Sequence, residues 1–168
     1  MAVARHRSTV RSTLGLAAVT PVLAAVVACA PPAAESPPAW QPPAGFAVTE
    51  TVTVADGRTL RLWTGPSGWY VESLTSGRHE AAVGAGGGGD RYAVSVVLDG
   101  LVGTVPVASA RAVEVGSPPV RADLHSGVFL VPATVVAAPT DQDVLVTPLD
   151  ATGRSIAPAT RVPIVGRG

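Results

Sequence analysis

The sequence predicts an all-β domain, built as an antiparallel β-sandwich of Ig-like architecture or as a small barrel. Between residues 46 and 168, short runs rich in Val, Thr and Leu recur at nearly regular spacing, separated by Gly, Pro, Asp and Ser. Several runs alternate polar and apolar residues, which is the period of a half-buried strand. No long amphipathic helical pattern occurs, and the Ala-rich residues 107–112 suffice only for a helical turn.

The first half of the domain predicts a three-stranded meander followed by a central strand. Asp56-Gly57 is a strong hairpin signal, and the GPSG sequence at residues 65–68 predicts the next turn. A glycine-rich loop then precedes the run RYAVSVVL, the best candidate for a central strand. The strands are therefore expected at residues 49–54, 58–62, 69–74 and 91–98.

The second half predicts two more strands and two hairpins. Strands are expected at residues 101–105 and 111–115, and a hairpin from residues 120–125 and 128–131. The last hairpin is expected from residues 144–149 and 154–156. A domain of about 120 residues buries a core without disulfides. The paired cysteines of immunoglobulin domains are missing, so the prediction concerns architecture alone.

The N-terminus predicts a signal peptide over residues 1–28. Three arginines in the first eleven positions precede a mostly apolar run over residues 14–28. That run suits the helical core of a signal peptide but is short for a helix that crosses about 30 Å of hydrocarbon. Pro21 would also kink a permanent membrane helix. The run ends at Cys29, the only cysteine of the chain, which therefore has no disulfide partner within it.

The sequence VVAC at residues 26–29 resembles the lipobox of bacterial lipoproteins: an aliphatic residue, a small or aliphatic residue, Gly or Ala, and then Cys. Val26 stands where that family most often has Leu. The resemblance implies a diacylglyceryl lipid on Cys29 and cleavage just before it. It places the chain at the extracytoplasmic face of the cell membrane. Two or three acyl chains anchor stably, since each buried CH₂ contributes ~0.8 kcal/mol.

Two alternatives to the lipid anchor stay open. Ala28-Cys29-Ala30 also fits an A-x-A cleavage site, which would release a soluble protein. However, Pro31 would then follow the cut directly, a position that this peptidase tolerates poorly. The other alternative is an uncleaved anchor helix. The position of the single cysteine at the end of the apolar run favours lipidation.

Residues 29–45 predict a tether between the lipidated cysteine and a domain over residues 46–168. Six prolines, all in pairs, favour extended polyproline II structure and pack no core. At ~3.1 Å per residue, this segment holds the domain up to about 50 Å from the bilayer. Trp40 lies inside the tether, and the sequence leaves open whether its ring packs on the domain or lies exposed.

Composition excludes several classes of function. Without the three N-terminal arginines, nine arginines face twelve acidic residues, so the mature part is mildly acidic. This argues against a nucleic-acid partner and against a polybasic membrane-binding surface. The chain has no Lys, which excludes Schiff-base, P-loop and Ser-Lys mechanisms. The lack of Lys and Asn, with abundant Ala, Val, Gly, Pro and Arg, indicates a high-GC, actinobacteria-like genome. Residues 96–156 are loosely similar to small all-β domains of actinobacterial exported proteins.

Several short patterns carry candidate chemistry. Residues 84–89 satisfy G-x-G-x-x-G, but no helix follows to face a pyrophosphate, so a flexible loop is expected. His79-Glu80 offers a metal ligand or base, and Asp123 and His125 share one face of a strand. Asp141 and Asp143 have the same spacing, and all these patterns fall short of three convergent metal ligands. Ser67 is expected in a turn rather than in a nucleophile elbow.

The aromatic residues Trp63, Trp69, Tyr70 and Tyr92 are most of the aromatic content of the domain. Trp69 and Tyr70 are neighbours on a strand, so their side chains point to opposite faces. Trp63 faces away from the leucines of its own strand if that strand is regular. At least one of these aromatic side chains is therefore expected outside the core, either facing solvent or covered by the tether or a loop.

The sequence thus favours a non-enzymatic interaction or structural domain, held at the membrane through a lipid on Cys29. It assigns no catalytic residue, cofactor or metal. The expected kind of partner is an envelope protein. The domain could also be the surface part of a larger assembly. The alternative is an envelope hydrolase or metal-binding protein that uses His79, Glu80, Asp123 and His125.

Overall fold

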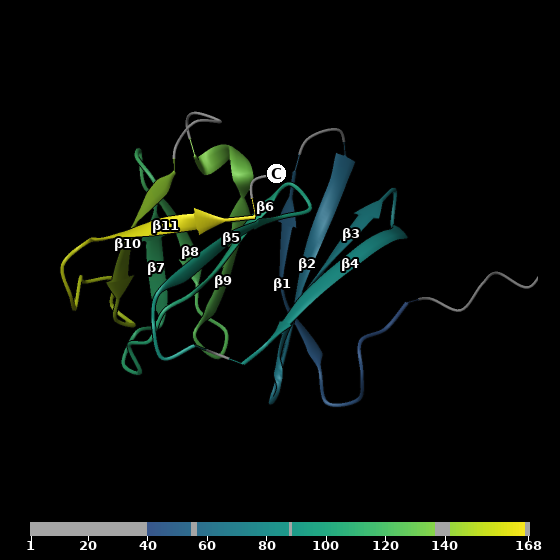
Figure 1. Cartoon of the computed structure of the whole chain (residues 1–168), viewed down its shortest axis with the longest axis horizontal. Coiled ribbons are helices and arrows are strands. Elements are labelled where there is room, and N and C mark those ends of the chain that lie inside the picture. The colour runs from purple at the N-terminus through teal and green to yellow at the C-terminus, as the bar shows by residue number, and fades with distance from the viewer. Residues whose placement is uncertain (1–39, 55–56, 88, 137–141, 167–168) are drawn as a thin grey trace, which may run out of the picture. The chain divides into compact units, whose positions relative to one another are not determined.

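The computed structural model describes residues 40–54, 57–87, 89–136 and 142–166, and this part of the chain is almost entirely β (Figure 1). The expected signal peptide, Cys29 and the tether up to residue 39 lie outside the described residues. The strands form a four-stranded sheet and a seven-stranded sheet that curls into a nearly closed barrel. The expectation of an all-β sandwich or barrel is confirmed.

The four-stranded sheet is an antiparallel meander with the order β1-β2-β3-β4. The expected turn at residues 65–68 joins the second and third strands, with Pro66 and Ser67 at its tip. Both Ser76 and Gly77 have positive φ angles, of 51° and 77°, and turn the chain into the fourth. The strands are β1 (Ala47–Thr53), β2 (Arg58–Gly65), β3 (Gly68–Thr75) and β4 (Arg78–Gly86).

β4 corrects the expectation of a three-stranded meander and of a glycine-rich loop after it. Its sequence, RHEAAVGAG, has little hydrophobic alternation and two glycines, so its local β signal is weak. The strand forms nevertheless, because it pairs with β3 along its length. Of the G-x-G-x-x-G motif, Gly84 and Gly86 are therefore strand residues, and the described residues between them and β5 form no helix.

The seven-stranded sheet has the order β8-β7-β10-β11-β5-β6-β9. Its pairs are antiparallel except for β11 and β5, which run parallel. This sheet is therefore mixed, which the local sequence patterns do not predict. Its strands are β5 (Ala93–Val97), β6 (Gly100–Thr104), β7 (Ala112–Val115), β8 (Val120–Asp123), β9 (Val128–Pro132), β10 (Asp143–Leu149) and β11 (Thr160–Val165).

The two expected hairpins of the second half form their turns, but each is closed by a single bridge and not by paired strands. β8 pairs with β7 and β9 pairs with β6, so only an isolated bridge between His125 and Val128 joins their neighbouring ends. In the last hairpin, Ser155 makes only a single bridge to Leu149, and the strands that pair with β10 are β7 and β11. Pro163 lies inside that strand, and a proline lowers the strand signal of any run that contains it.

Two hydrophobic cores lie on opposite sides of β5, β6 and β9. One core fills the inside of the curled sheet, with Phe129 and Leu101 among its buried residues. The other joins the two sheets, because Leu60 and Val71 of the first sheet cluster with Val102 of the second. β6 is buried at each of its five positions because its alternate side chains enter the two cores.

Hydrogen bonds close the turn that follows β10. The Oδ1 atom of Asp150 accepts hydrogen bonds from the hydroxyl of Thr152 and from the amides of Thr152 and Arg154. These bonds, of which that from the Thr152 hydroxyl has the largest effect, lower the pKa of the Asp150 carboxyl.

Among the described residues, there is no helix with the length and apolar character to span a bilayer.

Candidate functional site

The outer face of the four-stranded sheet carries an aromatic cluster, which the strand register assembles. Trp63 of β2 lies opposite Tyr70 of β3, and Arg61 lies opposite Glu72. The intervening residues Trp69 and Val71 face the core and are buried. The expected division of Trp69 and Tyr70 between opposite faces is confirmed, and Trp63 belongs to the outer face.

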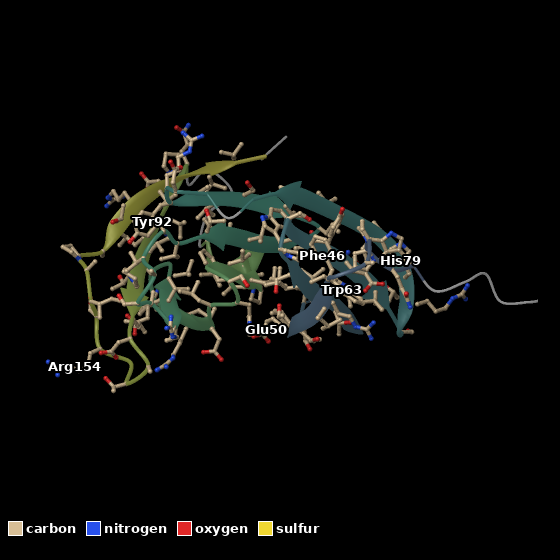
Figure 2. All side chains as sticks on the ribbon, turned by 90° about the horizontal axis from the view of Figure 1, so that it is seen from below. Phe46, Glu50, Trp63, His79, Tyr92 and Arg154 are labelled. Carbon is tan, nitrogen blue, oxygen red and sulfur yellow. The ribbon has the colours of Figure 1, made fainter. Side chains whose placement is uncertain are left out.

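Trp40 covers this face, which answers the question that the sequence left open. Its ring stacks on His79, with centroids 5.2 Å apart and planes 9° from parallel. It also meets Trp63 edge-on at 6.2 Å and Tyr70 at 5.9 Å. Phe46 contacts the other side of Tyr70 at 5.0 Å. Figure 2 shows Phe46, Trp63 and His79 at the same end of the domain. The end of the expected tether is therefore part of the folded surface.

Two glycines let these rings lie directly on the sheet. A Cβ atom at Gly84 would stand 2.3 Å from the Cδ1 atom of Tyr70 and 2.7 Å from the carbonyl oxygen of Trp69. A Cβ atom at Gly65 would stand 2.8 Å from the ring of Phe46. All three distances are below normal van der Waals contact, so any larger residue would displace a ring from the sheet.

Glu72 lies beneath the aromatic rings with only 3% of its side chain exposed. The indole N–H of Trp63 donates a hydrogen bond of 3.1 Å to its Oε2 atom. Its Oε1 atom lies 3.1 Å from Nδ1 of His79, and Oε2 lies 3.8 Å from Nη1 of Arg61. A buried carboxylate is costly unless hydrogen bonds and positive charge compensate it. Glu72 has both kinds of partner.

We call Trp40, Phe46, Trp63, Tyr70, Glu72 and His79 the Glu72 cluster. Its chemistry is that of a positioned imidazole: Glu72 holds one nitrogen of His79, and Trp40 holds the face of its ring. The arrangement fixes the histidine tightly against the sheet. It links the beginning of the described chain to three strands.

The second histidine of the domain lies in a different place. The Nε2 atom of His125 is 3.4 Å from Oε2 of Glu50, which joins the seven-stranded sheet to β1. Next to this pair is an open groove of about 450 Å³, lined by β1, β8 and β9. Glu50, Arg121 and Asp123 give it charged walls.

The structure does not bring the candidate residues of the sequence together. His79 pairs with Glu72, and Glu80 lies 3.5 Å from the hydroxyl of Ser73 instead. Asp123 lines the groove, whereas Asp143 pairs with Arg161 at 2.9 Å. Asp141 and Cys29 lie outside the described residues. Ser67 lies in a turn, as expected. No three His, Cys, Asp or Glu side chains of the described ranges are grouped as metal ligands.

Sequence reasoning missed Glu72, although the sequence held a usable signal. The tight turn at residues 65–68 fixes the register of its two flanking strands, and Gly65 pairs with Gly68. Counting outward from that pair places Trp63 beside Tyr70 and Arg61 beside Glu72, all on one face. An acidic residue between an arginine and aromatic rings is then a candidate for a buried ion pair.

Comparison of the chain with protein-family models, with curated proteins and with solved structures gives no match in any of the three.

Proposed function

We propose that this chain is a lipid-anchored protein of the bacterial cell envelope whose β-domain has an interaction or structural role rather than a catalytic one. The anchor rests on Cys29, which ends the apolar run within a lipobox-like sequence. Two or three acyl chains on that residue would hold the domain at the membrane without a spanning helix.

The engagement of the two histidines supports the non-catalytic role. His79 and His125, the histidines of the described domain, each contact a carboxylate on a neighbouring strand, and they do so in separate places. Each pair connects structural elements: the first lies under the docked Trp40, and the second bridges the sheets.

Metabolic labelling with a palmitate analogue tests the anchor. We expect the full chain to be labelled in a bacterial host and to sediment with the membrane. Cys29→Ser removes the acceptor thiol and should abolish both label and sedimentation. Val26→Leu is the matched control, because it keeps the aliphatic position of the lipobox and should leave labelling intact. Label that persists after Cys29→Ser would refute the anchor.

Elemental analysis tests the alternative of a metal-binding protein or metallohydrolase. The proposal expects the purified full chain to carry no stoichiometric transition metal or zinc and to keep its unfolding midpoint in chelator. A stoichiometric metal that disappears in both His79→Ala and His125→Ala would favour the alternative, because a shared metal would need both histidines.

A further inference from the structure

β4 is an edge strand with an unpaired side. In the part of the chain that the structure describes, the sheets end at β1, β4, β8 and β9. β4 pairs with β3 on one side and has no strand on the other. An unpaired edge presents backbone N–H and C=O groups to any extended chain that approaches it.

The other edges carry features that discourage pairing, whereas those of β4 are confined to its first three residues. A register shift interrupts β1 beside Glu50, β8 is four residues long with Arg121 and Asp123, and β9 ends in Pro132. Residues 81–86 of β4 contain only Ala, Val and Gly, and its own register shift comes earlier, before Ala81. Natural edges are normally protected by charge, proline or a bulge.

The hydrogen-bond pattern shows which groups of β4 face outward. The amide of Gly87 donates to the carbonyl of Ser67. Because hydrogen-bonded pairs alternate in an antiparallel ladder, residues 81, 83 and 85 point their backbone groups toward β3. Ala82, Gly84 and Gly86 then point theirs to the free edge, and none of them carries a bulky side chain.

We infer that β4 binds the β4 strand of a second copy of this chain, antiparallel and centred on Gly84. In this register Ala82 of one copy pairs with Gly86 of the other. Val83, which is 43% exposed in the single chain, comes to lie beside Ala85 of the second copy. The two strands thereby satisfy their outward backbone groups and cover an exposed apolar side chain.

Charge favours an antiparallel copy over a parallel one. The charged residues of β4, Arg78 and Glu80, are confined to its first three positions. A two-fold axis at Gly84 places the charges of the two copies at opposite ends of the shared sheet, outside the paired residues 82–86. Like charges placed opposite each other would destabilise a strand pair, and none meet across this one. A two-fold axis also gives a closed dimer rather than a fibre.

This inference rests on the proposed interaction role but does not require the lipid on Cys29. A single strand pair buries little surface, so the dimer belongs to the weak, transient class of interfaces. Attachment of both copies to one membrane would raise their effective concentration. We therefore expect dimers to be more abundant in cells than in dilute solution.

Photo-crosslinking of the full chain in bacterial cells tests the inference, with a benzophenone amino acid in place of Ala85. The expected product is a dimer in which the probe is joined to the β4 peptide of another copy. The same probe at Val165, on β11 and 63% exposed, is the matched control and should give no such product.

Substitutions at the edge sharpen this test. Val83→Lys places like charges near each other and should lower the amount of crosslinked dimer about fivefold. Val83→Glu should lower it equally. Producing both variants in one cell brings opposite charges together and should restore the crosslinked dimer. Ala82→Pro removes an outward donor without removing one that serves β3, and should also abolish the dimer.

The outcomes are distinct. Crosslinks to another protein, or none at all while palmitate labelling persists, overturn the dimer and leave the anchor intact. Crosslinked dimer without palmitate label overturns the anchor alone. Circular dichroism of each variant establishes that it is folded, and the rescue by opposite charges excludes a folding defect as the cause of a lost dimer.

Discussion

Glu72 is an acidic side chain at the centre of a sheet that is nonetheless almost excluded from water. The cost of removing its carboxylate from water is offset by the N–H group of Trp63, by His79 and by the more distant Arg61. The carboxylate therefore orients the residues around it, and its removal would leave several polar groups without their partner.

Glu72→Ala is expected to lower the free energy of unfolding by about 2 kcal/mol, because hydrogen bonds to charged groups contribute roughly 1.5–3 kcal/mol. Urea unfolding of the full chain, followed by circular dichroism, measures this change. Glu80→Ala is the matched control on the same sheet, and we expect it to stay within about 0.5 kcal/mol of the native chain. Equal effects of the two substitutions would contradict a special role for Glu72.

At this scale, alternation along a strand predicts the face of a side chain but not its partners. The opposite faces of Trp69 and Tyr70 follow from their adjacency, and the structure confirms them. The contact between Trp40 and His79 does not follow, because these residues are 39 positions apart and no local rule relates them. His79 was identified as a candidate, whereas its partner Glu72 was not.

At the scale of elements, β4 shows how pairing overrides weak local propensity. Its glycines make it a poor strand by composition, and the sequence pattern predicts a loop there. In the structure the same glycines are useful: Gly84 gives the ring of Tyr70 room to lie against the sheet. The element therefore exists because of β3, and its composition is adapted to what covers it.

Gly84→Ala is expected to destabilise the domain by about 1–3 kcal/mol, the usual cost of overpacking. The added Cβ would meet both the ring of Tyr70 and the carbonyl oxygen of Trp69, and the backbone oxygen moves less easily than the ring. Gly86→Ala is the matched control, because its Cβ would stand 3.6 Å from its nearest neighbour, the carbonyl oxygen of Ser67.

Thermal unfolding of both glycine variants, compared with the native chain, measures the difference. We expect Gly86→Ala to leave the midpoint nearly unchanged, or to raise it slightly by restricting the unfolded chain. If Gly84→Ala were as stable as Gly86→Ala, the close packing of Tyr70 on the sheet would be wrong.

At the scale of the whole molecule, the described domain combines the two architectures that the sequence left open. The seven-stranded sheet encloses one core as a barrel does, and the four-stranded sheet packs on it through a second core as in a sandwich. Trp40 adds a further connection, because it joins the end of the proline-rich segment to the Glu72 cluster.

Trp40→Ala is expected to lower the free energy of unfolding by about 2 kcal/mol, since each well-placed aromatic pair contributes roughly 0.5–1.5 kcal/mol beyond area burial. It should also make the chain around residue 40 more susceptible to limited proteolysis. Trp40→Phe keeps a stacking ring. We expect it to lower the free energy of unfolding by less than half of the change expected for Trp40→Ala. Unchanged proteolysis and stability in Trp40→Ala would show that the docking is not significant in solution.

The sequence by itself determined the all-β class, most of the turns and the opposite faces of neighbouring residues, because these depend on short-range periodicity and on turn chemistry. It also supplied the prediction of a lipid anchor at Cys29. The tertiary structure alone decided that β9 pairs with β6 instead of β8, that β11 lies beside β5, and that Trp40 covers Glu72. These contacts join residues far apart in the chain, so they depend on which arrangement buries two cores at once rather than on any local pattern.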